Sequence, residues 1–278
     1  RDLVALLAPA AEEGERILPS LAQKLPALAR RRAQAAIGMA WTAAGRSAHD
    51  ADLLEKAGTQ LREAIAGMDV NEDREFWAMT QNVLGNSLRL RGDIEQRNDC
   101  LEQGLAAYDA AETVFTRNQM PLHWAMVENN RGATLWTLGR RGGDSQVLKD
   151  AVTAYRRAAE IVTKPRMPVS WAMIQNNLGS ALRALGEREV GPETLYEAVE
   201  AHTSALEVLT RARLPLHWAK TQSQLAAVYA VLGERGAGTE RLEEAVAAYR
   251  SALEVYSRER LPAEWAQTQN GLGAALAM

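Results

Sequence analysis

The sequence repeats itself at a fixed distance, and tryptophan marks the period. Five tryptophans are spaced by 47 residues every time: Trp77, Trp124, Trp171, Trp218 and Trp265. Eight residues after each comes a glycine or an alanine: Gly85, Gly132, Gly179, Ala226 and Gly273. Self-similarity at a period of about 20 to 50 residues is typical of chains that stack one supersecondary unit many times. Such chains bury their core between neighbouring units, so the period constrains the fold more than the length does.

Each repeat contains two helical patterns. The first opens on a proline, at Pro121, Pro168, Pro215 and Pro262, and in complete copies closes on a glycine, at Gly92, Gly139, Gly186 and Gly233. Proline suits the first turn of a helix and glycine suits its end. The second pattern carries apolar residues three and four apart, and a basic residue follows it, at Arg117, Lys164, Arg211 and Arg258. We expect these basic residues to complement the dipole of the second helix.

The chain is therefore predicted to be all-α, a solenoid of stacked antiparallel helix pairs over residues 20–278. The expected repeats lie near residues 26–72, 73–119, 120–166, 167–213 and 214–260, with a half repeat at 261–278. The glycine eight residues after the tryptophan should let paired helices approach closely. Residues 1–19 are expected to be one helix or two short ones, left from a degraded repeat. A boundary near Pro9 is predicted, because proline breaks or kinks a helix interior.

Composition narrows the function classes. The net charge of −3 argues against a nucleic-acid binder, and we interpret the run Arg30 to Arg32 as a solvated helix face rather than a contact for an acidic partner. Cys100 is the one cysteine, which excludes an intramolecular disulfide and favours a reducing, cytoplasmic setting. No apolar run reaches the roughly 18 residues of a membrane span, and no signal peptide is found. Because the sequence starts at Arg1, we expect a fragment or a processed product.

The repeat resembles the tetratricopeptide repeat family, which has the pattern W-x2-L-G-x2-Y, then A-x3-F, then P. The residues that match stand at Gln175, Leu178, Gly179, Leu182, Ala151 and Tyr155, with Gln in the tryptophan position and Leu in the first tyrosine position. The period exceeds the family's, which is about 34 residues. The doubled asparagine before L-G is similar to kinesin light chain repeats and to long repeats of bacterial signalling proteins. The resemblance covers about residues 20–278 and implies a right-handed superhelix with a concave, ligand-binding face lined by first helices.

The expected binding surface is the side of the first helices opposite their packed side. At 100° per residue, Leu178, Gly179 and Leu182 define the packed side. The opposite side carries Met, Asn and Arg in three consecutive copies, and one tryptophan: Met79, Asn82, Asn86, Arg89, Met126, Asn129, Asn130, Trp136, Met173, Asn176, Asn177 and Arg183. This set is called the stripe below. The fourth copy departs from it with Lys220, Ser223 and Gln224, so we expect that copy to modulate binding rather than anchor it.

Each residue type of the stripe has a second interpretation. The asparagine amides can hold the backbone of an extended peptide, or they can form a hydrogen-bonded ladder between repeats. The methionines can form an adaptable surface for apolar side chains, or they can fill gaps between helices. Trp136 is either an exposed anchor for a partner or partly buried against Arg183.

The sequence predicts binding rather than catalysis. It shows no nucleophile elbow, no paired metal motif and no carboxylate constellation, so no enzyme activity, cofactor or metal is expected. The leading hypothesis is a scaffold that binds a peptide or protein segment on its concave face. The alternatives are a regulatory or sensor arm of a larger signalling enzyme or NTPase, and a self-assembling structural module. The half repeat at 261–278 exposes an apolar face, so we expect self-association there or further repeats in the native protein.

Overall fold

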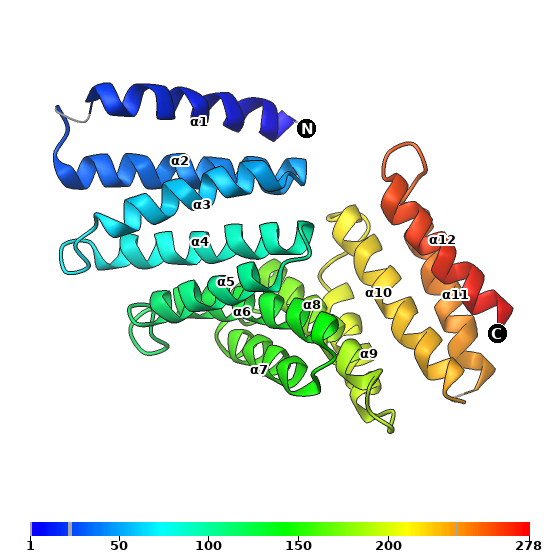
Figure 1. Cartoon of the computed structure of the whole chain (residues 1–278). Coiled ribbons are helices and arrows are strands. Elements are labelled where there is room, and N and C mark those ends of the chain that lie inside the picture. Colours follow the sequence, from blue (N-terminus) through cyan, green and yellow to red (C-terminus); the bar gives the residue numbers. More distant parts are fainter. Residues whose placement is uncertain (1, 22–23, 237) are drawn as a thin grey trace. The chain divides into compact units, whose positions relative to one another are not determined.

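The computed structural model describes residues 2–21, 24–236 and 238–278, and over these ranges it contains twelve α-helices and no strand (Figure 1). The chain divides into two compact units, Arg1–Leu138 and Gly139–Met278. The first unit holds α1 (Asp2–Leu21), α2 (Ala27–Ala48), α3 (Ala51–Ala66), α4 (Arg74–Ile94), α5 (Asn98–Glu112) and most of α6 (Pro121–Gly142). The second holds α7 (Ser145–Ile161), α8 (Pro168–Gly186), α9 (Glu193–Leu206), α10 (Pro215–Glu234), α11 (Thr239–Leu253) and α12 (Pro262–Ala277).

Consecutive helices pack against each other within each unit. In the first unit α1 packs on α2, α2 on α3, α3 on α4, and α4 on α5 (Figure 1). In the second unit the same sequential packing runs from α7 to α12. We call α2, α4, α6, α8, α10 and α12 the first helices, because they carry the first pattern of each repeat, and α3, α5, α7, α9 and α11 the second helices. The predicted all-α fold of paired helices is confirmed, and the right-handed superhelix stays a prediction.

Glycine allows the two helices of a pair to approach closely. A Cβ atom placed on Gly85 would lie 2.5 Å from the ring of Tyr108, and one placed on Gly179 would lie 2.7 Å from the ring of His202. Both distances are far below ordinary van der Waals contact, so a ring from the second helix occupies the space that a side chain would need. The predicted close approach at Gly179 is confirmed.

The expected boundary near Pro9 is wrong. α1 runs without interruption from Asp2 to Leu21 and contains both Pro9 and Pro19. Both prolines lie on the exposed side of the helix, where water can satisfy the carbonyl groups that lack an N–H partner. On the other side Ala11 is buried in a cluster with Trp41, so packing holds the helix together across the prolines.

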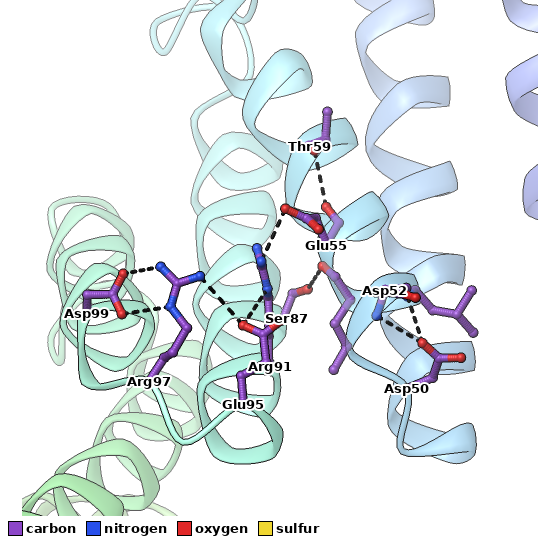
Figure 2. A network of polar contacts seen from close by, with 11 residues as sticks. Asp50, Asp52, Glu55, Thr59, Ser87, Arg91, Glu95, Arg97 and Asp99 are labelled. Carbon is purple, nitrogen blue, oxygen red and sulfur yellow. Dashed lines mark hydrogen bonds and ion pairs between the residues drawn. The ribbon is translucent and has the colours of Figure 1, made fainter.

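A polar network ties the ends of three helices of the first unit together (Figure 2). The Ser87 hydroxyl of α4 donates to the Leu54 carbonyl of α3 at 2.9 Å. Arg91 of α4 forms ion pairs with Glu55 of α3 at 3.2 Å and with Glu95 at 3.0 Å. Arg97, just before α5, pairs with Asp99 in its first turn. Asp50 caps α3 by accepting from the backbone N–H groups of Asp52 and Leu53.

The basic residue after each second helix has a different role from the one expected. The second helices end before it, so it does not complement their dipoles. Instead each cation lies over the tryptophan ring that opens the next first helix, at 5.6 Å for Arg117 over Trp124, 5.5 Å for Lys164 over Trp171, 5.9 Å for Arg211 over Trp218 and 5.8 Å for Arg258 over Trp265. Lys164 and Arg211 also pair with Glu207 and Glu254, which follow the next second helices. The repeated tryptophan is therefore covered by a cation at each of these junctions.

Candidate functional site

Two asparagines of the stripe in the first unit are joined by a hydrogen bond between their side chains. Asn130 of α6 donates through Nδ2 to Oδ1 of Asn82 in α4, at 3.0 Å. The side chain of Asn82 is almost fully enclosed, with 2% of its residue surface exposed. This is the ladder contact between neighbouring repeats, and it leaves Asn82 unable to reach a ligand at the surface.

Asn86 takes part in a second internal contact. The hydroxyl of Tyr108 in α5 donates to Asn86 Oδ1 at 2.9 Å. Burial raises the pKa of Tyr108 to about 12, against the opposing influence of the nearby Arg89 charge. The phenol therefore remains a neutral hydrogen-bond donor at physiological pH. Asn86 and Arg89 are both half-buried beside this ring.

The remaining stripe residues of the first unit are also half-buried: Met79, Met126, Asn129 and Trp136. Met79 packs against the cluster that contains Tyr108 and Phe115, so it fills space between helices. Trp136 is half-buried, so part of the residue faces solvent, and its role as an anchor stays a prediction. The first unit thus presents a surface of partly accessible side chains.

The stripe is more accessible in part of the second unit. Met173 of α8 is 41% exposed, and Asn177 and Arg183 on the same helix are half-buried. Arg183 forms an ion pair with Glu187, one turn further on. Asn176, by contrast, is 6% exposed and bonds inward, where His202 Nδ1 donates to its Oδ1 at 3.2 Å.

His202 occupies the place that Tyr108 and Tyr249 occupy in other repeats. Its ring is completely buried between α8 and α9, against Gly179 and Asn176. Burial, with a smaller contribution from the positive charge of Arg183, lowers the pKa of His202 to about 3. The imidazole is therefore a neutral, fully buried packing group at physiological pH.

A cavity of about 460 Å³ with a mixed lining lies between the N-terminal halves of α10 and α12, both first helices of the second unit. Its lining mixes opposite charges, amides, hydroxyls and apolar groups: Leu216, His217, Lys220, Ser223, Gln224, Tyr256, Leu261, Glu264, Gln267 and Thr268. Lys220 and Glu264 are exposed, so both charges reach a ligand from solvent. Such a lining suits a peptide segment that carries both polar and apolar groups.

Sequence reasoning missed this cavity because the fourth copy departs from the stripe. Lys220 stands where the earlier copies have methionine, and the shorter Ser223 stands where they have asparagine. The ladder persists there in altered form, since Gln224 Nε2 donates to the Ser180 hydroxyl at 2.7 Å and Ser223 lies 3.4 Å from the Thr268 hydroxyl. The departure from the common pattern is the signal that could have pointed to this cavity.

Arg32 and His123, which lie outside the stripe, have structural contacts. Arg32, which is exposed at the surface of α2, pairs with Asp73 at 2.7 Å and lies over the ring of Phe76 in α4. His123 stacks on Phe115 with ring centroids 4.8 Å apart. Among the described residues, no group of three or more His, Cys, Asp or Glu side chains is placed to hold a metal ion. Every helix in those ranges is too short or too polar to span a bilayer.

Comparison with known proteins shows the fold and no more. No protein-family model matches the chain, and no curated protein matches it. Among solved structures, the chain is similar to BtubC (BKLC) from P. vanneervenii, with 18% identity, a TM-score of 0.54 and 92% of each chain covered. It also aligns with the TPR2AB domain of yeast Sti1 in complex with pHSP90, at 14% identity over 97% of this chain and 99% of that one, with a TM-score of only 0.30. The fold is an array of tetratricopeptide-like helical repeats.

Proposed function

We propose that the chain is a cytoplasmic interaction scaffold that binds a peptide or protein segment along its first helices. The observation that carries the proposal is the cavity between α10 and α12, which is lined by two first helices and holds accessible groups of both charges. Met173 of α8 adds an exposed apolar group on the same set of helices in this unit. In the first unit the partly accessible Met126, Asn129 and Trp136 are the proposed contacts.

The proposed site differs from the stripe in two respects. Asn82 and Asn176 are excluded as ligand contacts, because both are buried in bonds to other side chains. Lys220, His217 and Gln267 are added, because they line the cavity from two neighbouring first helices. The long repeats and the doubled asparagine support a likeness to kinesin light chain and bacterial signalling arrays, a finer assignment that is also a proposal.

The test starts from a peptide selected from a random display library against the whole chain. We expect Met173→Glu and Lys220→Glu each to weaken binding of that peptide at least about tenfold, which corresponds to roughly 1.4 kcal/mol. The matched control is Thr203→Glu, which places the same charge on an exposed position of the second helix α9. Isothermal titration calorimetry measures all three affinities. Unchanged binding by both first-helix variants, or loss only with Thr203→Glu, contradicts the proposal.

A further inference from the structure

The loops that precede three first helices of the second unit each present one exposed arginine: Arg166, Arg213 and Arg260. We call these three residues the basic edge. Each stands directly before the residue that caps α8, α10 or α12. Among the residues that the structure describes, no acidic side chain forms an ion pair with any of the three.

The backbone holds the three arginines in the same way. The residue after each has nearly the same dihedral angles, with φ −140° and ψ 66° at Met167, −139° and 63° at Leu214, and −139° and 64° at Leu261. In each loop the N–H of that residue donates to the carbonyl four residues earlier, at 2.9 Å. Because the loops share one conformation, the arginines recur at the spacing of the repeat along one edge of the unit.

The fold does not require an arginine at this position. Gln119 takes the same place in the loop before α6, which forms the same 2.9 Å backbone hydrogen bond. The other cation of the loops before α8 and α10 is neutralised by an ion pair, Lys164 with Glu207 and Arg211 with Glu254. The charge of the basic edge therefore stays available for a partner.

Exposed apolar side chains accompany these charges, with exposed fractions of 37% for Met167, 42% for Val169 and 55% for Leu216. The first turns of α8 and α10, which the structure describes in full, hold no acidic residue. The third loop is less positive, because Glu259 adjoins Arg260 and Glu264 stands in the first turn of α12. The edge thus combines positive charge, strongest at its first two loops, with apolar contact area.

The spacing of the arginines selects the conformation of a partner. α10 packs beside both α8 and α12, and packed helices lie roughly 8 to 10 Å apart. A polyproline II segment rises about 3.1 Å per residue with three residues per turn, so every third side chain returns to the same side after about 9 Å. Acidic residues at every third position of such a segment would therefore meet successive arginines.

We propose that the basic edge binds an extended acidic segment of a partner protein, with Asp or Glu at every third residue and apolar residues between them. Each carboxylate pairs with one arginine, and the apolar residues contact the exposed side chains beside it. Arginine suits this role, because its planar guanidinium can bind a carboxylate through two parallel hydrogen bonds. The three arginines do not line the cavity between α10 and α12, so the inference does not rest on binding there.

The charge pattern favours a protein segment over a membrane or a nucleic acid. Polybasic sites for anionic lipids gather about 4 to 8 Lys or Arg residues. Nucleic-acid binding likewise neutralises several phosphates with a comparable number of cations. The basic edge offers one arginine per loop, on a chain with a net charge of −3. Single, evenly spaced arginines match single, evenly spaced carboxylates.

The test titrates the whole 278-residue chain into a fluorescein-labelled peptide of repeated Glu-Leu-Pro triplets and follows fluorescence anisotropy. Binding should be saturable in low salt and weaken as the salt concentration rises. Arg166→Gln and Arg213→Gln should each weaken it about threefold and together about tenfold, because exposed ion pairs are individually modest. Arg260→Gln should have a smaller effect. Circular dichroism should show an intact fold, because the chain itself has glutamine in this place at Gln119.

Two controls locate the site and its spacing. Arg250→Gln removes an exposed charge from the second helix α11 and should leave binding unchanged. A peptide of the same composition, with all its glutamates at one end, should bind more weakly than the triplet peptide. The proposal is refuted by a wild-type chain that shows no saturable binding, by equal binding of the two peptides, or by equal weakening through Arg250→Gln and Arg213→Gln.

Other occupants of the edge would give different results. Cosedimentation tests binding to phosphatidylserine vesicles, and light scattering tests dimers of the chain alone. Vesicle binding that Arg213→Gln abolishes would show that the edge meets a membrane. Dimers that the same variant dissociates would show that a second copy covers it. Either result refutes a partner protein as the occupant.

Discussion

Substitution of two equivalent glycines by alanine should change stability in opposite directions. Gly179→Ala places a Cβ atom 2.7 to 2.8 Å from three atoms of the His202 ring. Ordinary contact begins near 3.4 Å, so the ring must move by several tenths of an ångström. It cannot move freely, because it is fully buried and bonded to Asn176, which is itself buried.

The net effect of Gly179→Ala follows from three contributions. Overpacking of a dense core typically costs about 1 to 3 kcal/mol. Loss of the bond between His202 and Asn176 would add about 1 kcal/mol. Alanine offsets about 1 kcal/mol through its better helix propensity. We therefore expect Gly179→Ala to reduce the free energy of unfolding by roughly 1 to 3 kcal/mol.

Gly273→Ala is the matched control, since the two glycines occupy the same position of their repeats. The added methyl group at Gly273 meets nothing within 4 Å, so only the helix propensity acts. Stability should rise by a few tenths of a kcal/mol up to about 1 kcal/mol. Urea unfolding followed by circular dichroism at constant pH measures both variants. Equal stabilisation by both substitutions would refute the close packing of His202 on Gly179.

Two further predictions concern buried and stacked groups. His202 has a pKa of about 3 in the folded chain against about 6.5 in the unfolded chain, so the unfolded state takes up the proton first and stability falls as the pH drops below about 6.5. Between pH 7 and pH 4 the protonation of His202 should lower the free energy of unfolding by about 3 kcal/mol. The variant His202→Tyr should not show this part of the loss. Urea unfolding at the two pH values measures the difference. Lys164→Met removes the positive charge over Trp171 and the ion pair with Glu207. The side chains of Lys164 and Glu207 are 44% and 55% exposed, so the free energy of unfolding should fall by less than about 1 kcal/mol. The loss should be smaller in high salt, as unfolding in urea at two salt concentrations would show. A cost that high salt leaves unchanged would contradict a charge effect.

The fold class was predictable because residues at many separate positions specify the repeat. The tryptophan, the proline and the two glycines recur with one spacing, and each has a local physical role that does not depend on distant contacts. The continuous helix through Pro9 was not predictable, because it depends on Ala11 packing against a neighbouring helix and on both prolines facing water. The position of the basic residues over the tryptophan rings likewise depends on how one repeat meets the next.

The candidate site was only partly predictable from the same pattern. Helical spacing predicts that Met173, Asn177 and Arg183 lie on the same side of one helix. It cannot distinguish an amide side chain that faces solvent from one that forms a hydrogen bond with a neighbouring side chain. Asn82 and Asn176 are buried because particular partners, Asn130 and His202, stand opposite them. The sequence predicts a secondary role for the fourth copy, because Lys220, Ser223 and Gln224 depart from the residues that the other copies share. These same three residues line the cavity, which only the packing of α10 against α12 reveals.

The central claim is that the first helices form the binding face, and site-specific photo-crosslinking tests it most directly. A benzophenone amino acid at Lys220 of the cavity, or at Met173, should crosslink to a library-selected peptide, and mass spectrometry should identify the joined fragments. The same amino acid at Thr203, on the second helix α9, should give no crosslink to that peptide. Crosslinks from Thr203, with none from Met173 or Lys220, would show that the partner binds the second helices and would contradict the account.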